Sequence, residues 1–528
     1  MEFVVPYARP RRIPLQWIVA LASLLGTSPA AAQGPSLADR ITKITERPEF
    51  KGALFGIKVV SLDRDSVVFS LNSDKLFVPG STTKLLTVGT ALQLLGSDYR
   101  FHTKVYRTGP VGADGTLRGD LVLVASGDPN LSHRIRGDSL LFVDEDHSYG
   151  NDPATDLVAG DPLQVLRKLA GQVKAHGIKR ITGSVRVDAS LYDGGERELG
   201  TGVMISPIVV NDNIVDIVIA AGDKVGAPAK LTVQPTTGYV HVINKIVTGS
   251  ADSASAGDIT TDSLNHDGTR TIVLTGRKRI GGKPGLLTYK VAEPDRYAAA
   301  GLVRALQDAG IVVTVAKPAL LPAKPGRYAA DQVVAEHVSP PFREAAKVIL
   351  KVSQNLHASA MPYVLGAVLK GTKDAQGGFD LEHEFLTKAG LDLAGAVQSD
   401  GAGGSALYTP DFMVSYLRYM ATQKSAADFI HALPILGRDG TLAKISRDAP
   451  AAGHVFAKTG TLVDGDLLNR GLIVQGKGLA GYLTTRSGQR LVIAIYINRV
   501  KVSNGDQIQS MVGQAAGDVA AAIYDAVP

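Results

Sequence analysis

Cysteine is absent from all 528 residues of this chain. Its absence excludes disulfide bridges, thiolate metal sites and a cysteine nucleophile. Positive charge is in small surplus, since the chain has 56 Lys and Arg and 50 Asp and Glu. So weak a surplus does not favour nucleic acid as a partner. The 45% hydrophobic and 20% charged content is that of a globular protein, and the length predicts two or three domains.

Long apolar runs are scarce as well, and the one near the N-terminus has the pattern of an export signal. Three arginines within residues 9–12 precede the apolar residues 17–25, and the small-residue stretch 27–32 follows. This order predicts a signal peptide over residues 1–32, cleaved after Ala32. The alternative is an uncleaved membrane anchor, but the run is short for a span. Cleavage would lower the formal charge from +6 to about +4 and leave an exported chain without a stable membrane anchor.

Metal-binding motifs are also lacking. The 11 histidines are scattered, and no H-E-x-x-H occurs among them. The segment Glu382-His383-Glu384 fits the charged surface of a helix better than a pair of ligands. We therefore expect neither a metal nor another cofactor.

Strand and helix patterns are clearest at the two ends of the chain. Apolar and β-branched runs bounded by turn residues predict five strands, the first two joined as a hairpin. They span residues 55–62, 66–71, 456–462, 479–485 and 491–498. Helices are expected at 36–46, at 405–420 and over 512–523. Hairpin strands predict an antiparallel sheet flanked by helices, in one α/β domain built from residues 33–98 and 336–528.

The intervening residues 99–335 differ in texture. They alternate short strands with turns, and residues 249–268 form a long polar stretch. This pattern predicts a mainly β insertion of one or two nested subdomains.

Three short motifs follow one another along the chain. The only S-x-x-K begins at Ser81, before a helical pattern, and the only K-T-G begins at Lys458, in a predicted strand. S-x-N begins at Ser70, Ser263 and Ser353, and only the last falls at a turn between two helical patterns. Each motif alone has an ordinary alternative, as a helix N-cap, a turn or a strand end. Together, in this order, they are a far more specific signal.

These motifs resemble those of the serine penicillin-recognising enzymes. The gap of 272 residues between Ser81 and Ser353 suits the low-molecular-mass class C penicillin-binding proteins, peptidase family S13, which carry a large insertion there. Further segments look like that family, at residues 119–131, 293–297, 339–341, 399–401 and 439–442. The resemblance implies a serine β-lactamase/transpeptidase-like fold.

The resemblance also implies a function. The chain would be a periplasmic serine D-alanyl-D-alanine carboxypeptidase acting on peptidoglycan peptides, with D,D-endopeptidase activity as an open alternative. β-Lactam antibiotics would be its inhibitors, and it would need no cofactor.

The residue types suit acyl transfer through a serine. A serine hydroxyl is a poor nucleophile until a base takes its proton, and a lysine one helical turn on lies on the same face. Ser81 is therefore the expected nucleophile and Lys84 its base, kept neutral by burial and by the nearby charge of Lys458. By the resemblance, Ser353 would relay the proton to the departing amine, and Asn355 would hold the substrate amide and fix the motifs together.

The same resemblance assigns the binding of substrate. Lys458 and the hydroxyls of Thr459 or Thr461 would receive the terminal carboxylate. Gly460 would let the substrate lie along the strand edge. The backbone N–H groups of Ser81 and Thr461 would form the oxyanion hole.

Departures from the family pattern keep two other functions open. Ala402 stands where a serine is usual, an arginine expected near Leu407 is missing, and residues 463–478 are longer and more polar than the expected loop. One alternative is a catalytically weak cell-wall-binding protein of the same fold. The other is a β-lactamase-like or esterase hydrolase using the same motifs.

Overall fold

The computed structural model of the chain describes residues 35–132, 134–137, 139–140, 146–150, 157–314 and 326–527. The expected signal peptide, residues 1–32, lies outside the described residues. Within the described ranges, no helix has the length and apolar character needed to cross a membrane.

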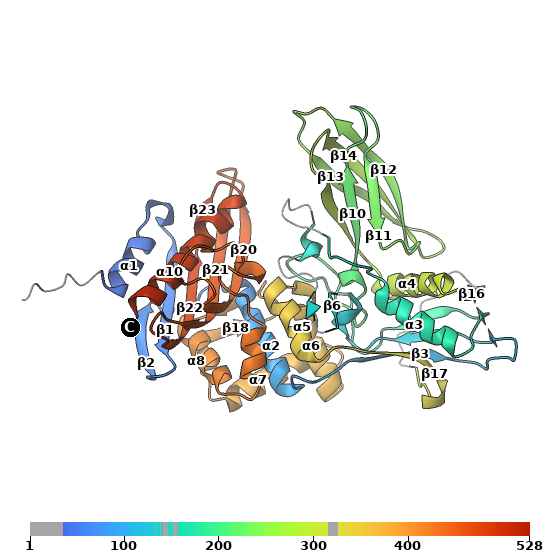
Figure 1. Cartoon of the computed structure of the whole chain (residues 1–528), viewed down its shortest axis with the longest axis horizontal. Helices are drawn as coiled ribbons and strands as arrows, with labels where there is room; N and C mark the ends of the chain where they lie inside the picture. Colours follow the sequence, from blue (N-terminus) through green and yellow to red (C-terminus); the bar gives the residue numbers. More distant parts are fainter. Residues whose placement is uncertain are drawn as a thin grey trace, which may run out of the picture.

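The two ends of the chain meet in one sheet, the main sheet, with the strand order β2-β1-β22-β21-β20 and with β23 paired to β21 (Figure 1). Its strands are β1 (Leu54–Ser61), β2 (Ser66–Leu71), β20 (Val455–Asp466), β21 (Gly471–Thr484), β22 (Arg490–Asn498) and β23 (Val500–Val502). All of these pairings are antiparallel. The predicted hairpin and the antiparallel sheet are therefore confirmed.

Helices cover both faces of the main sheet. The helices of these two segments are α1 (Leu37–Thr45), α2 (Lys84–Leu94), α5 (Phe342–Lys347), α6 (Asn355–Leu365), α7 (Gln376–Lys388), α8 (Pro410–Ala421), α9 (Ala426–His431) and α10 (Gln514–Ala526), and α5, α6 and α7 pack against α2. In Figure 1, α1 and α10 lie on one side of the sheet, and α2 and α8 on the other. The predicted first helix is confirmed, with Ser36 capping it through the backbone N–H of Asp39.

The central strand β22 explains how the two layers are held. Its side chains alternate between two cores, as a strand buried on both faces must. Ile493 and Ile495 pack with Ile523 of α10, whereas Ala494 and Tyr496 belong to the core that contains α2. Both faces of the sheet are therefore buried, and α2 packs into one of the two cores.

Two predicted elements are wrong. The expected loop over 463–478 is instead the continuation of β20 and β21, which pair as far as Asp466 opposite Gly471. Polar side chains pair across this exposed hairpin, and Gln475 Nε2 donates a hydrogen bond to Asp464 Oδ2 at 2.9 Å. The polar composition therefore reflects exposure of the strands to solvent and does not indicate a loop. The helix expected over 405–420 begins only at Pro410.

Capping explains that later start. Thr409 Oγ1 accepts a hydrogen bond from the N–H of Phe412 at 3.0 Å, and Pro410 takes the first helical position. The preceding residues form β19 (Ala406–Tyr408), which pairs with β18 (Ala396–Gln398).

Strands dominate the chain between α2 and α5, which also contains α3 (Gln164–Ala175) and α4 (Pro294–Asp308). The helices pack on the sheet β17-β3-β5-β9, beside the small sheet β16-β8-β4. Two further sheets, β11-β10-β15 and β12-β14-β13, project away from them (Figure 1). The domain limits expected from the sequence stay predictions.

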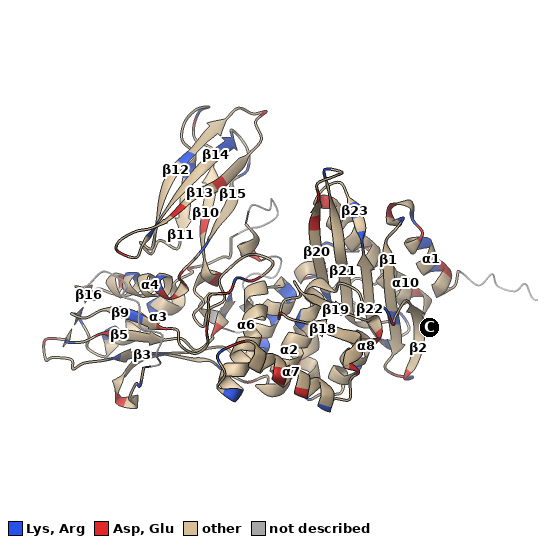
Figure 2. Ribbon diagram, turned by 180° about the vertical axis from the view of Figure 1, so that it is seen from behind, with Lys and Arg blue, Asp and Glu red and all other residues tan. Residues whose placement is uncertain are grey.

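The strands of this region are β3 (His102–Arg107), β4 (Thr116–Leu117), β5 (Leu121–Val124), β6 (Ile135–Arg136), β7 (Ser139–Leu140), β8 (Arg180–Ile181), β9 (Val185–Asp188), β10 (Ile214–Ala220), β11 (Lys230–Gln234), β12 (Val240–Gly249), β13 (Ala256–Leu264), β14 (Arg270–Arg279), β15 (Gly285–Lys290), β16 (Val312–Val313) and β17 (Val333–Val338). Basic and acidic residues are interspersed over the ribbon in Figure 2.

Candidate active site

Ser81 and Lys84 lie where the chain enters α2. Ser81 belongs to the short 3-10 helix Gly80–Thr83, and its side chain makes no capping hydrogen bond. Lys84 is the first residue of α2 and is fully buried, with its Nζ 2.7 Å from Ser81 Oγ. The N-cap alternative for Ser81 is therefore wrong. The lysine nitrogen faces the serine hydroxyl, as a base would.

The second motif lies at the turn before α6. Ser353 stands between the π-helical turn Val348–Val352 and α6, in a left-handed conformation with φ 67°. A serine rarely adopts this conformation, which aims its side chain at the cluster. Lys84 Nζ lies 3.4 Å from Ser353 Oγ and 2.5 Å from Asn355 Oδ1. The other two S-x-N motifs begin on β2 and on β13, and each ends one residue beyond its strand.

The third motif lies on the edge strand β20. Lys458 is fully buried, and its Nζ donates to Ser353 Oγ at 2.8 Å and to the carbonyl of Thr459 at 2.9 Å. Thr459 Oγ1 lies 2.7 Å from Thr441 Oγ1. The structure thus brings all three motifs into one hydrogen-bonded cluster, although they are far apart in sequence.

Position 460 requires glycine for backbone packing, whereas the expected reason was access of the substrate to the strand edge. A Cβ at this position would lie 1.9 Å from the carbonyl oxygen of Pro79, and one at Gly80 would lie 2.5 Å from the nitrogen of Thr461. The backbones of β20 and the 3-10 helix are therefore in direct contact. This contact holds the Thr461 segment against the segment that carries Ser81.

Burial sets the protonation of the lysines. It lowers the pKa of Lys84 to about 8, while the carboxylates of Glu198, Asp146 and Asp400 act in the opposite direction. The pKa of Lys458 falls well below its usual value through burial and the charges of Lys84 and Lys477. For Lys84, then, burial rather than the charge of Lys458 favours the neutral form.

The region between α2 and α5 supplies residues that the motifs did not reveal. Asn355 Nδ2 donates to the hydroxyl of Tyr149 at 2.8 Å, and Gln354 Nε2 donates to Asp146 Oδ1 at 3.2 Å. A Cβ on Gly200 would lie 2.4 Å from Asn355 Nδ2. Tyr149, Asp146 and Gly200 stand in no recognisable motif, because only the tertiary fold brings them to the S-x-N motif.

A cluster of buried charged side chains surrounds Asp212 and reaches the S-x-N motif through His357, two residues after Asn355. Asp212 Oδ2 is 3.0 Å from Arg134 Nε and 3.0 Å from His147 Nε2, and Asp212 Oδ1 is 3.0 Å from His357 Nε2. His147 Nδ1 faces Asp216 Oδ1 at 3.1 Å. Burial alone would raise the pKa of Asp212, but these cations hold it well below its usual value. We call Arg134, His147, Asp212, Asp216 and His357 the Asp212 cluster.

One position that departs from the family pattern, Ala402, lies in a turn beside the 3-10 helix. The N–H of Ala402, a buried residue, donates to Asp400 Oδ1 at 2.7 Å. A Cβ on Gly403 would lie 2.1 Å from the carbonyl oxygen of Gly80. Leu407 lies on β19. The turn at Asp400 therefore supports the segment that carries Ser81.

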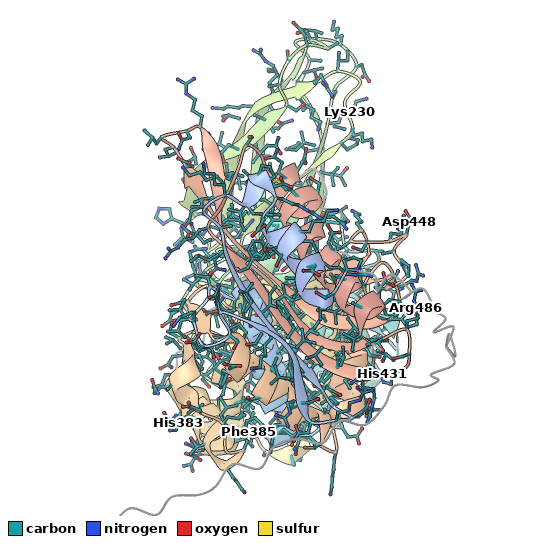
Figure 3. The ribbon with its side chains drawn as sticks, turned by 90° about the vertical axis from the view of Figure 1, so that its left-hand side faces the viewer. Lys230, His383, Phe385, His431, Asp448 and Arg486 are labelled. Carbon is teal, nitrogen blue, oxygen red and sulfur yellow. The ribbon has the colours of Figure 1, made fainter. Side chains whose placement is uncertain are left out.

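No group of three or more His, Asp or Glu side chains in the described part of the chain is arranged to hold a metal ion. His383 lies on the outer surface of α7 (Figure 3). Its neighbour Glu382 is buried, and burial raises its pKa to about 8, so the expected charged surface does not include this residue.

Comparison with known proteins decides the family. The model of the D-Ala-D-Ala carboxypeptidase 3 (S13) family matches residues 37–518. The chain belongs to this family. The resemblance inferred from the motifs is thus confirmed, as is the class of enzyme, a D-Ala-D-Ala carboxypeptidase.

Two relatives and two solved structures of one protein illustrate the match. The chain is 29% identical over 466 residues to a D-alanyl-D-alanine carboxypeptidase of Actinomadura sp. (strain R39), covering 83% of this chain and 80% of the relative. It is 26% identical over 473 residues to the D-alanyl-D-alanine carboxypeptidase DacB of Haemophilus influenzae, covering 87% and 88%.

The crystal structure of penicillin binding protein 4 (dacB) from Haemophilus influenzae matches with a TM-score of 0.70 at 24% identity, over 92% of this chain and 99% of that one. The same protein complexed with a novel β-lactam matches with a TM-score of 0.68, again at 24% identity and over 92% and 99%. The predicted fold class is therefore confirmed.

Proposed function

We propose that this chain is an exported serine D-alanyl-D-alanine carboxypeptidase that acts on peptidoglycan stem peptides through an acyl-enzyme at Ser81. One observation carries the proposal: the fully buried Nζ of Lys84 lies 2.7 Å from Ser81 Oγ and 2.5 Å from Asn355 Oδ1. A lysine in this setting can be neutral near pH 8 and can take the serine proton.

Acylation then follows from the contacts. Ser81 Oγ attacks the carbonyl carbon of the penultimate D-alanine while Lys84 takes its proton. The C–N bond to the terminal D-alanine breaks, and its nitrogen receives a proton through Ser353, whose oxygen lies between the two lysines. Water hydrolyses the ester and regenerates Ser81.

Substrate binding is assigned to the edge of β20. The carboxylate of the terminal D-alanine would meet Lys458 and the hydroxyls of Thr459 or Thr461. The N–H groups of Ser81 and Thr461 would donate to the oxyanion, supported by the backbone contact that Gly460 and Gly80 permit. Asn355 would hold the substrate amide as well as Lys84.

The finer parts of the proposal rest on chemistry and on the relatives. A β-lactam presents a reactive amide beside a carboxylate, so it would acylate the same serine, and the Haemophilus protein has been captured with such a compound. The leader pattern of residues 1–32 supports export, and a peptidoglycan substrate supports the periplasm. A purely binding protein is not favoured, because the three motifs are in mutual contact.

Release of D-alanine tests this function. The purified chain is incubated with an acylated tripeptide that ends in D-alanyl-D-alanine, beside its all-L isomer, and free D-alanine is measured. We expect release by the wild type, none by Ser81→Ala and none from the isomer. Binding of the peptide without release by the wild type would overturn the proposal.

A further inference from the structure

Lys477 is a third buried lysine beside the motif residues, and no motif includes it. It lies on β21 directly opposite Thr461 of β20, with only 2% of its surface exposed. Its Nζ donates to Thr461 Oγ1 at 2.8 Å and to Gln509 Oε1 at 3.0 Å. Two neutral oxygens thus hold the ammonium group.

This lysine has no acidic partner in the ranges that the structure describes. No carboxylate there lies within 4.0 Å of Lys477 or of Lys458. Burial lowers the pKa of Lys477 to about 8, so most of it is protonated at neutral pH. Burying a cation without a counter-ion is unfavourable, so the site around Lys477 is suited to receive an anion.

The hydrogen bond from Lys477 to Thr461 also favours an anion at this site, because of its direction. A lysine ammonium can only donate, so the oxygen of Thr461 accepts from Lys477. The hydroxyl hydrogen of Thr461 must then point away from Lys477, toward another acceptor. Thr461 is only half-buried and follows Lys458 on the same edge strand, where the carboxylate of the substrate is expected.

We propose that Lys477 is a positioning residue for the terminal carboxylate of the substrate. It orients the Thr461 hydroxyl as a donor and places a positive charge behind it, so that the carboxylate becomes the counter-ion of Lys477. This inference rests on the proposed function. It names the substrate class more closely, as acyl donors whose leaving group carries a free carboxylate.

A matched pair of thioesters tests the idea. Both carry the same acyl group, but one leaves as thioglycolate and the other as neutral thioglycolamide. The variants are Lys477→Met, Lys477→Gln, which keeps hydrogen-bonding atoms, and Lys477→Arg, which keeps the charge. Lys501→Met removes the same charge from an exposed position on β23 and serves as the control. Thermal melting shows which variants fold.

We expect Lys477→Met to lower kcat/KM for the thioglycolate ester about 10- to 100-fold, mainly through KM, as for loss of a charge-assisted hydrogen bond. Turnover of the thioglycolamide ester should change by less than about 2-fold, and Lys477→Arg and Lys501→Met should keep the preference for the charged ester. If the methionine variant does not fold, Lys477→Gln carries the same expectation.

Equal losses on both esters, or none on the charged one, would overturn the role of Lys477. A wild type inactive on both esters would instead overturn the proposed function and this inference with it. The two failures are thus distinguishable.

Discussion

Asp212 and His357 form a buried hydrogen bond, with Asp212 Oδ1 3.0 Å from His357 Nε2 and neither side chain more than 4% exposed. Asp212 belongs to the strand-rich region between α2 and α5, and His357 lies in the first turn of α6, close to Ser353 and Asn355. The strand-rich region therefore supports the S-x-N motif directly. Its removal or rearrangement would disturb residues that touch Lys84.

Asp212→Asn tests this support. It leaves Arg134 and His147 buried without their shared carboxylate, which typically costs about 3–5 kcal/mol of stability. We expect a clear drop in melting temperature and, at temperatures where the variant is folded, slower acylation of Ser81 measured with a β-lactam.

Asp223→Asn is the matched control. Its ion pair is with Lys230, an exposed residue that Figure 3 labels. Exposed ion pairs contribute only about 0–1 kcal/mol to the free energy of unfolding. Equal stability and acylation rates in both variants would show that the Asp212 cluster does not support the site.

His147 should make stability depend on alkaline pH. Burial alone would lower its pKa, but Asp216 and Asp212 outweigh burial and raise it to about 9. Because the folded pKa lies above the unfolded value of 6.5, the stabilisation is fully present below pH 6.5 and is lost as pH rises through 9.

Denaturant unfolding between pH 6 and pH 10 measures this effect. Relative to His147→Gln, the wild type should lose roughly 2–3 kcal/mol of unfolding free energy over the alkaline part of that range. Parallel pH profiles for the two proteins would contradict a charged His147.

Lys84 should set the pH dependence of acylation. Only its neutral form can take the proton of Ser81, so the acylation rate should rise tenfold per pH unit below about pH 8 and level off above it. The negative charge of Glu198 raises the pKa of Lys84, so Glu198→Gln should move the midpoint of the acylation pH profile to lower pH. Stopped-flow acylation by a chromogenic β-lactam measures both. A midpoint that moves upward in the variant would contradict this electrostatic account.

Gly460→Ala should damage the site through the backbone. The new Cβ would meet the carbonyl of Pro79 at 1.9 Å and push β20 away from the 3-10 helix, separating the two expected oxyanion donors. We expect acylation to slow by about 100-fold or more, the usual effect of losing one such donor. Gly465→Ala on the same strand is the control, since its Cβ would meet only Leu467 Cδ2 at 3.8 Å. Comparable acylation in both variants would refute the packing argument.

The motif residues could be picked out from the sequence because their expected chemistry demands particular residue types at short spacings. Ser81 and Lys84 are one helical turn apart, and Ser353 and Asn355 share one turn of chain, so each pair is visible locally. Asp212 and His357 are separated by 145 residues, and Lys477 meets Thr461 only through strand pairing. Such contacts depend on the tertiary fold and leave no short-range pattern.

The misread segments have a similar cause. Residues 463–478 are polar because the hairpin they form is exposed, and polarity alone does not distinguish an exposed strand from a loop. The reason for Gly460 was also hidden, since only the structure shows that Pro79 occupies the space a side chain would need.

The intact mass of the mature protein after incubation with benzylpenicillin tests the central claim, an acyl-enzyme at Ser81, most directly. We predict a stable mass increase of one penicilloyl group, located on Ser81 by peptide mapping and absent from Ser81→Ala. No adduct with the penicillin intact, or an adduct that persists in the variant, would contradict the claim. No adduct with the penicillin consumed would instead identify a β-lactamase-like hydrolase.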